Sequence, residues 1–261
     1  MGVDESRRPS SLIFFLALCV GLFALSRWQH APPAEVLLFD GIGTSRGDVR
    51  AFKNLLDRQD VRFDTADADD INRMHKDKLR AYRLLIVPGG NFEEMGREFT
   101  PYGRENIRAA VANGMNYLGV CAGAFLAGAL RDNHDINLTG VPYSFYSAER
   151  RGIRKAPVWI TTPGGPPLEH SWEDGPDLTG WGTIIAKYPD GAAAATQGKF
   201  ENGWVVLSGV HPEAPESWRN GMTFSTPAEV DNAWAAALVD AALHGKWLPY
   251  FRPDDAPQLP R

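Results

Sequence analysis

The sequence predicts an α/β protein of three layers, in which helices cover both faces of a mostly parallel central sheet. Short apolar runs typical of buried strands alternate with helical segments along the first half of the chain. The second half is richer in strand-like segments and contains the hairpin signal Asn202-Gly203, whose residues both tolerate positive φ. We therefore expect a parallel core sheet followed by a β-hairpin-rich second half.

The first half contains four predicted strands separated by helices. Parallel strands that are buried on both faces carry continuous apolar runs, as residues 35–39 and 84–87 do. Turn residues follow both runs, namely Asp40-Gly41-Ile42-Gly43 and Pro88-Gly89-Gly90. The expected strands are 35–39, 61–63, 84–87 and 116–120, and the expected helices are 49–56, 71–82, 102–113 and 122–130.

The second half is expected to form strands 157–162, 183–187, 192–200 and 204–210, then helix 232–244. Three regions follow along the chain: a targeting segment with its linker (1–33), one domain (34–246) and a Pro-rich tail (247–261). A domain of about 210 residues is long enough for one sizeable core and short for two.

The first thirty residues differ from the rest of the chain. Arg7 and Arg8 precede an apolar run over residues 12–25, which as a helix reaches only about 21 Å. That is short of the roughly 30 Å hydrocarbon core, but it suits a signal peptide with Ala24-Leu25-Ser26 as its cleavage site. The alternatives are a retained membrane anchor and a misread start or buried helix. Both leading interpretations predict an extracytoplasmic domain, periplasmic or secreted, with membrane contact through this segment alone.

Composition and charge exclude several classes of function. The chain is 44% hydrophobic and 23% charged, as in ordinary soluble proteins. Its net charge of −5 provides no basic footprint for nucleic acid. The segment 41–47 has one residue too many for a dinucleotide fingerprint, so we interpret it as a loop that lines the pocket.

Metal-binding patterns are also weak, and no cofactor or metal is expected. Asp67-Ala68-Asp69-Asp70 resembles half a calcium loop but lacks the central glycine and closing glutamate, so a helix cap is the better interpretation. Acidic and histidine residues in segment 131–135 and at Glu169-His170 could be ligands, although solvated turns explain them more simply.

The cysteine count isolates one thiol. Of two cysteines, Cys19 lies in the apolar run, so Cys121 is the only thiol of the domain and is either a buried small hydrophobe or a reactive group. Gly119-Val120-Cys121-Ala122-Gly123 joins a predicted strand directly to a helix. This is a nucleophile elbow with cysteine in place of serine, and a helix start favours the thiolate.

A candidate base follows another predicted strand, in His211-Pro212-Glu213. Proline favours an extended conformation in the residue before it, so the side chains at 211 and 213 are expected to point to the same side. Glu213 would then orient the imidazole as the third member of a triad does. The alternative is a loop histidine beside a surface glutamate.

The third candidate part of the site is the turn Pro88-Gly89-Gly90, which follows a predicted strand. Ligands of such sheets bind beyond the carboxyl ends of the strands, where backbone N–H groups of Gly90 and Ala122 could form an oxyanion hole. The alternative is an ordinary turn. The predicted oxyanion and substrate-binding residues are Gly89, Gly90, Ala122, Gly41 and Gly43.

Together these motifs resemble the class I glutamine amidotransferase-like superfamily, and more closely the N-terminal domain of biotin-protein ligases in its free-standing form. The matching stretches are 36–43, 84–90, 117–128, 172–177, 186–191 and 205–218. The resemblance implies a flavodoxin-like three-layer sandwich and a catalytic triad of Cys121, His211 and Glu213. Glutaminases of the superfamily usually continue the elbow with histidine and glutamine, whereas Ala124-Phe125 stands here, which argues against glutamine hydrolysis.

The predicted function is therefore an exported amidase or peptidase-type hydrolase that acts on an amide or peptide C–N bond of a small molecule or peptide. The alternative is a ligand-binding or regulatory module that keeps the pocket without turnover. No biotin-ligase catalytic half is present, so ligation is not expected.

Overall fold

The computed structural model describes residues 33–130, 132–146 and 155–252. The apolar run at 12–25, on which the prediction of export rests, lies outside these residues. Across the described ranges, no helix combines the length and apolar character needed to cross a membrane.

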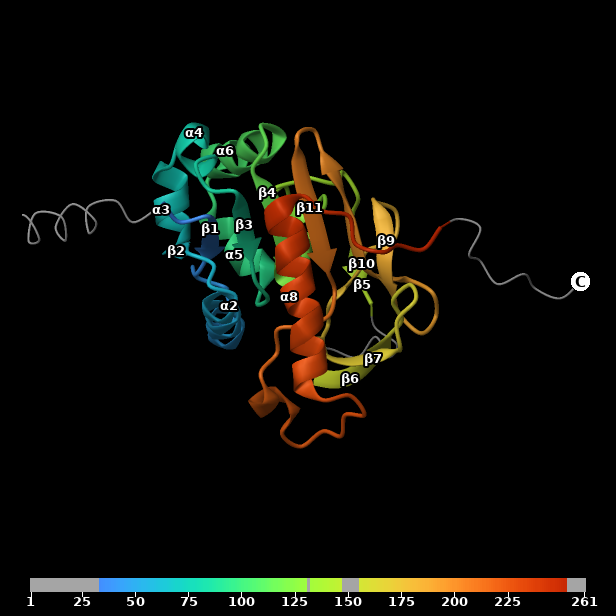
Figure 1. Ribbon diagram of the computed structural model, residues 1–261. Helices are drawn as coiled ribbons and strands as arrows, with labels where there is room; N and C mark the ends of the chain where they lie inside the picture. Colours follow the sequence, from blue (N-terminus) through green and yellow to red (C-terminus); the bar gives the residue numbers. More distant parts are fainter. Residues whose placement is uncertain (1–32, 131, 147–154, 253–261) are drawn as a thin grey trace, which may run out of the picture. The chain divides into compact units, whose positions relative to one another are not determined.

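A seven-stranded sheet forms the centre of the domain, in the order β2-β1-β3-β4-β11-β10-β9 (Figure 1). Its strands are β1 (Val36–Phe39), β2 (Phe63–Ala66), β3 (Leu84–Val87), β4 (Asn116–Val120), β9 (Thr183–Lys187), β10 (Ala193–Phe200) and β11 (Gly203–Ser208). The first four strands and β11 pair in parallel, and β10 and β9 add an antiparallel edge. The predicted flavodoxin-like α/β architecture with a mostly parallel sheet is thereby confirmed.

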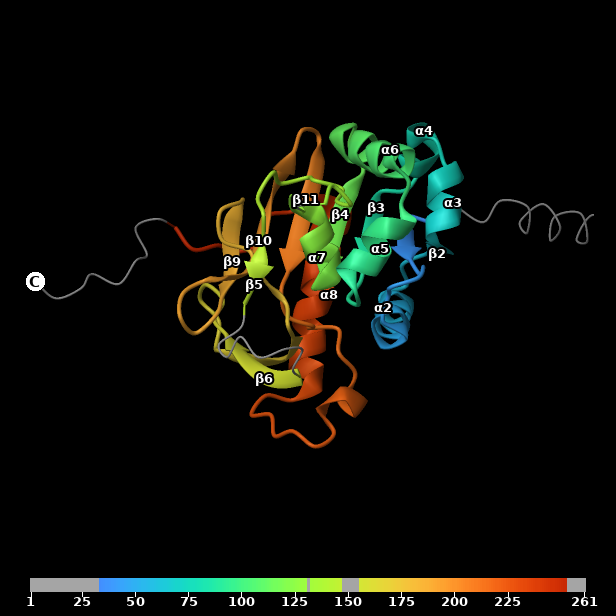
Figure 2. The ribbon, with the colours of Figure 1, turned by 180° about the vertical axis from the view of Figure 1, so that it is seen from behind.

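Helices cover both faces of the sheet, as the views in Figure 1 and Figure 2 show from opposite sides. One face carries α2 (Arg46–Arg58) and α8 (Ala228–His244); the other carries α3 (Ala68–Arg73), α4 (Lys76–Leu79), α5 (Phe92–Glu98), α6 (Pro101–Ala112) and α7 (Ala122–Ala127). Alternate residues of β1 explain the two layers, because Leu38 belongs to the core under α2 and Leu37 to the core under α6. Both residues are completely buried.

The second half also forms two small two-stranded antiparallel sheets outside the central sheet, one of which is a hairpin. β6 (Lys155–Ile160) pairs with β7 (Leu168–Glu173), and β5 (Ser144–Phe145) pairs with β8 (Pro176–Asp177). A 3-10 helix, η1 (Glu216–Arg219), follows β11. The prediction of a hairpin-rich second half is confirmed, but the sequence did not identify β7.

Three local predictions are wrong for identifiable reasons. In place of the helix expected at 71–82 the structure has α3 and α4. The chain is extended at Met74, and the His75 side chain caps the start of α4 by accepting from the Asp77 N–H. The helix expected at 122–130 ends at Ala127, since Gly128 lies against Val141 and Tyr143. Glu169 and His170, interpreted as part of a solvated turn, are buried in β7.

Two other predictions can be followed in the structure. Asp67 is the N-cap of α3, where its side chain accepts from the Asp70 N–H, as expected of a helix cap. The start of the tail lies along the sheet edge, because the Gln197 side chain donates to Leu248 O and accepts from Leu248 N, and Phe251 N–H donates to Ile184 O.

Candidate active site

Cys121 lies in a strained turn between β4 and α7. Its φ of 50° and ψ of −105° are unusual for a residue with a side chain, and such strain is found at nucleophile elbows. The flanking glycines are needed for packing: a Cβ on Gly123 would lie 2.0 Å from Val87 O, and one on Gly119 would lie 2.6 Å from Gly123 O. The predicted elbow geometry is present.

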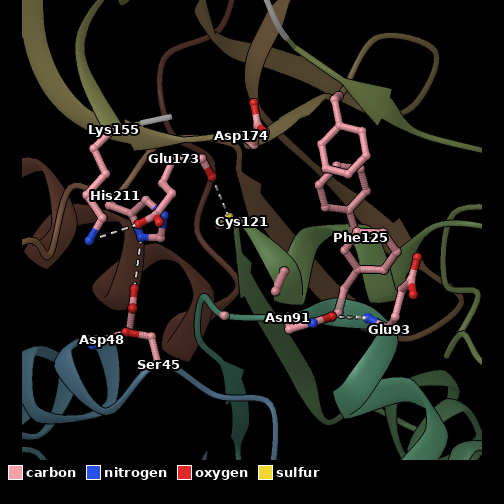
Figure 3. Close-up of a pocket in the computed structure, with 14 residues that line it drawn as sticks. Ser45, Asp48, Asn91, Glu93, Cys121, Phe125, Lys155, Glu173, Asp174 and His211 are labelled. Atoms are coloured by element: carbon pink, nitrogen blue, oxygen red, sulfur yellow. Dashed lines mark hydrogen bonds and ion pairs between the residues drawn. The ribbon is translucent and has the colours of Figure 1, made fainter. Parts of the chain in front are cut away.

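His211 follows β11 and faces the same cavity as Cys121 (Figure 3). Its backbone forms an isolated bridge to Ser171 of β7, with a hydrogen bond of 2.9 Å from His211 N to Ser171 O. The imidazole is buried, and the charge of Cys121 is among the influences that raise its pKa. Trp218 of η1 packs edge-on against the ring, at 5.5 Å between centroids, and helps to exclude water.

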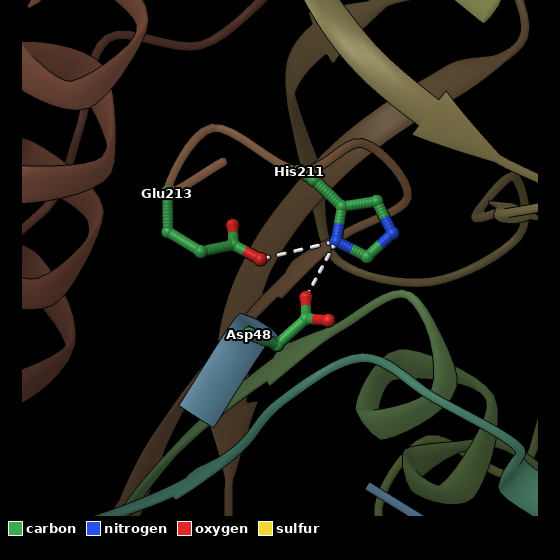
Figure 4. A group of neighbouring side chains, drawn as sticks. All are labelled: Asp48, His211 and Glu213. Carbon is green, nitrogen blue, oxygen red and sulfur yellow. Dashed lines mark hydrogen bonds and ion pairs between the residues drawn. The ribbon is translucent and has the colours of Figure 1, made fainter. Parts of the chain in front are cut away.

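Two acids converge on one nitrogen of His211 (Figure 4). Nδ1 lies 3.0 Å from Glu213 Oε1, the contact expected from the sequence, and 2.8 Å from Asp48 Oδ1. The other ring nitrogen, Nε2, points away from both acids. Asp48, His211 and Glu213 are at most 3% exposed, so their charges interact with little screening by water.

Asp48 was not identified from the sequence. It lies in the first turn of α2, where its backbone N–H donates to the side chain of the N-cap Ser45. Ser45-Arg46-Gly47-Asp48 is a capping-box pattern, which by itself indicates only a helix start. The contact with His211 spans 163 residues of sequence, and no local pattern could have revealed it.

The three groups differ in their tendency to ionise. Burial raises the pKa of Asp48, but the charge of His211 and hydrogen bonds from His211, Glu213 and Ser45 outweigh it and lower the pKa to about 2. For Glu213 burial prevails and raises the pKa to about 7. Burial lowers the pKa of His211, yet the charges of Asp48 and Cys121 hold it well above its ordinary value. An imidazolium beside an ionised Asp48 is the favoured state.

A cavity of about 530 Å³ opens in front of Cys121 and His211. On one side the rings of Phe92, Phe125 and Phe145 lie together, with centroids 4.6 Å apart for Phe92–Phe125 and 5.0 Å for Phe125–Phe145. On the other side Lys155 and Glu173 form an ion pair of 3.2 Å. The remaining lining residues are Ser45, Asp48, Gly90, Asn91, Glu93, Ala122 and Asp174.

The predicted oxyanion and substrate-binding residues divide into two groups. Gly90 and Ala122 line the cavity. Gly41, Gly43 and Gly89 are not part of its wall. Gly43 O accepts from Asn91 N, which holds the segment that carries Gly90, and Gly89 leaves room for the imidazole, since a Cβ there would lie 2.5 Å from His211 Cε1.

Among the described residues, Asp48, His211 and Glu213 form the one group of side chains placed to hold a metal ion, with donor atoms within 4.8 Å of one another. Their nitrogen and two oxygens are a donor set that zinc accepts. A cation there would have to replace the proton on Nδ1, which both acids already contact.

Comparisons with known proteins agree with the resemblance identified in the sequence. Residues 34–137 match the family model described as biotin-protein ligase, N terminal. Among curated proteins, none matches the chain.

Solved structures with the same fold include a glutamine amidotransferase with 22% identity and a TM-score of 0.54, over 71% of this chain and 94% of that one. A glutamine amidotransferase from Thermotoga maritima has 14% identity and a TM-score of 0.56, over 82% and 100%. An exo-β-1,4-mannosidase from an Opitutaceae bacterium, strain TAV5, has 16% identity and a TM-score of 0.51, over 83% of this chain and 38% of that one.

Proposed function

Because the fold is that of glutamine amidotransferases and a strained cysteine faces a buried histidine, we propose that the protein is a cysteine hydrolase acting on an amide or peptide C–N bond. The observation that carries this proposal is the arrangement at His211, whose Nδ1 contacts two acids while its ring lines the same cavity as the strained Cys121. This order of nucleophile, base and acid is that of a catalytic triad.

The proposed reaction has two halves. The Cys121 thiolate attacks the substrate carbonyl, and the N–H groups of Gly90 and Ala122 stabilise the oxyanion that forms. The His211 imidazolium then gives its proton to the leaving amine, and a thioester remains on Cys121. In the second half His211 takes a proton from water, hydroxide attacks the thioester, and the acid product leaves as the thiolate–imidazolium pair is restored.

The cavity wall favours an apolar acyl group over glutamine. Position 125, where glutaminases of the superfamily usually hold their polar substrate, is a phenylalanine stacked on Phe92 and close to Phe145. An apolar or aromatic substituent would bury against these rings, whereas a carboxamide side chain would lose hydrogen bonds to water there. We therefore propose amides of apolar or aromatic acids as substrates.

A panel of amides tests this function. Purified protein is incubated with phenylalanine amide, N-acetylphenylalanine amide, leucine amide and glutamine, and ammonia release is measured together with the mass of any thioester on Cys121. We expect ammonia from apolar amides, and none in Cys121→Ala. The matched control is Ser144→Ala, an exposed hydroxyl in β5. Hydrolysis of glutamine in preference to the apolar amides would overturn the substrate class, and equal turnover by Cys121→Ala would overturn the mechanism.

A binding module without turnover remains the second candidate, because one observation favours it. The Cys121 side chain is nearly buried, and its thiol lies 3.5 Å from Glu173 O, to which it donates. A thiol committed to a carbonyl is not aimed at a substrate. If amides raise the melting temperature of the parent and of Cys121→Ala equally, with no thioester and no ammonia, this second function is the correct one.

We also propose that residues 12–25 direct export, so that the domain acts outside the cytoplasm. The motivation is the pattern of Arg7 and Arg8 before an apolar run of signal-peptide length. Fusing residues 1–33 to a reporter active only after export should yield activity, and replacing Leu16 and Leu18 with Asp should abolish it. Activity that survives this replacement would contradict the proposal.

A further inference from the structure

We propose that Asp48 is the ionised acid that positions His211, and that Glu213 is neutral and shares its proton with Asp48. This inference rests on the proposed function, because it concerns which carboxyl group supports the base of the same site. It departs from the resemblance, which assigns the acid of the triad to Glu213. Asp48 is a positioning residue, since it acts through His211.

Asp48 and Glu213 cannot both be ionised acceptors of the single proton on His211 Nδ1, so one of the two carboxyl groups must be protonated. Nδ1 has one N–H, but Asp48 Oδ1 and Glu213 Oε1 both lie within 3.0 Å of it. In the described part of the chain, His211 is the only cation that forms an ion pair with either acid. Two buried carboxylates beside one imidazolium would leave an uncompensated negative charge, and such pairs retain a proton instead.

The surroundings decide which acid retains it. Asp48 lies in the first turn of the thirteen-residue helix α2, where the helix N-terminus favours negative charge, and the Ser45 side chain hydrogen-bonds to it. Among the described residues, Asp48 Oδ2 and Glu213 Oε2 both lack a hydrogen-bond partner, but of the two acids only Asp48 has a helix N-terminus to favour its charge, and the Glu213 side chain is fully buried. A carboxylate in that position would lose its hydration without replacement, whereas a protonated carboxyl can donate to Asp48.

The ionisation tendencies of the two groups agree with this assignment. Burial is the largest influence on both groups: it raises the pKa of Glu213 to about 7, whereas for Asp48 the charge and hydrogen bond of His211 outweigh it and lower the pKa to about 2. Asp48 then stabilises the imidazolium by its charge, and through it the Cys121 thiolate. Glu213 contributes a hydrogen bond and no charge over most of the acidic and neutral range.

Two isosteric substitutions separate the roles. Asp48→Asn removes the charge next to Nδ1, whereas Glu213→Gln keeps the size of the side chain and, like a protonated carboxyl, is uncharged and offers both a donor and an acceptor group. Alkylation of Cys121 by iodoacetamide at pH 6 is followed by mass spectrometry. We expect Asp48→Asn to slow it by about 10- to 1,000-fold, because an opposite charge at this distance shifts an ionisation by one to three pH units. Glu213→Gln should slow it by no more than about threefold.

Matched controls keep the result interpretable. Asp57→Asn removes an exposed carboxylate from the same helix and should leave the rate unchanged. Circular dichroism and thermal unfolding establish that each variant is folded. A large effect of Glu213→Gln with a small effect of Asp48→Asn would overturn the assignment, and so would equal effects of both.

Infrared spectroscopy tests the shared proton without any substrate or thiol chemistry. The parent protein at pH 6 should show the C=O stretch of a buried protonated carboxyl, which disappears in Glu213→Gln. Absence of that band in the parent, or its persistence in Glu213→Gln, would overturn the inference even if Asp48→Asn does not fold. Failure of the proposed function looks different, because the band would remain while neither amides nor electrophiles react at Cys121.

Discussion

Two buried histidines lie almost side by side in this fold, and only one has the surroundings of a catalytic base. His211 pairs with Ser171, the residue after His170 in β7, so the two imidazoles leave the backbone on opposite faces. His211 faces the cavity, with two acids on Nδ1, and it shares that cavity with the Cys121 thiol. His170 is completely buried, and its Nδ1 lies 3.3 Å from Asp231 Oδ2 without the geometry of a hydrogen bond.

The two histidine clusters differ in what neutralises the acid. The His170 cluster consists of His170, Asp231 and Arg219, and the His211 cluster consists of His211, Asp48 and Glu213. Asp231 pairs with Arg219 at 2.6 Å, so a permanent cation neutralises it and no proton has to move. Within the described ranges, the His211 imidazole is the only cation that pairs with Asp48 and Glu213. A histidine beside an acid is therefore structural where a guanidinium already balances the charge, and suited to proton transfer where the ring itself must carry the balance.

The largest expected effect on stability is in the His170 cluster. Asp231→Asn leaves Arg219 buried without its partner and weakens the contact that the Thr226 hydroxyl makes with Asp231. Loss of one partner from a buried pair costs about 3–5 kcal/mol. Chemical unfolding should show this loss, while the alkylation rate of Cys121 stays within about twofold because this cluster does not support the base. If Cys121 in folded Asp231→Asn is alkylated as slowly as in Asp48→Asn, both clusters support the base and the proposed difference between them is wrong.

The pH dependence of stability should come from the His211 cluster. Glu213 has a folded pKa of about 7 against an ordinary 4.5, so the stability it contributes is complete below pH 4.5 and is lost as the pH rises through 7. His211, also raised, acts in the same direction from its ordinary 6.5 upward. Asp48, lowered to about 2, contributes stability above pH 3.8 that is lost only in strong acid.

Glu213 alone should therefore cost the parent about 3 kcal/mol of unfolding free energy between pH 4.5 and pH 7, at about 1.4 kcal/mol per pKa unit, and His211 should add to that loss above pH 6.5. Glu213→Gln should flatten most of that slope. Denaturant titrations at a series of pH values measure it, and a parent whose stability rises with pH over this range would contradict the assignment.

Gly89→Ala should lower the unfolding free energy by a smaller amount, because the added Cβ would push His211 away from Asp48. The added Cβ would meet His211 Cε1 at 2.5 Å and Asp48 Oδ1 at 2.8 Å. Overpacking of this kind costs about 1–3 kcal/mol, and the displaced ring should also slow Cys121 alkylation. Gly165→Ala is the control, because the nearest atom to its new Cβ is the Thr162 hydroxyl in an exposed turn. Equal rates in the two variants would show that Gly89 does not set the position of His211.

Local signals made most of this molecule predictable. The buried strands β1 and β3 are continuous apolar runs, and Cys121, His211 and Glu213 each stand in a short motif whose geometry follows from the backbone. Asp48 could not be found in this way, because its role arises only when the start of α2 packs against the end of β11. The same applies to the aromatic wall, which α5, α7 and β5 build from three separate segments.

The smallest expected effect concerns the ion pair at the mouth of the cavity. Lys155 Nζ lies 3.2 Å from Glu173 Oε2, but the two side chains are 52% and 33% exposed, so water screens the attraction. Pairs of this kind contribute about 0–1 kcal/mol, and Lys155→Gln should leave the unfolding free energy within that range. The substitution should change substrate preference more than stability, because Lys155 lines the cavity. Without this cation, the acids that line the cavity, Glu173 and Asp174 among them, make it more negative. Hydrolysis of a cationic amide such as phenylalanine amide should then gain relative to the uncharged N-acetyl compound, by about 0.5–1 kcal/mol or two- to fivefold, and more at low salt. If the ratio of kcat/KM for phenylalanine amide to kcat/KM for the N-acetyl compound does not change with salt, Lys155 lies outside the path of the substrate.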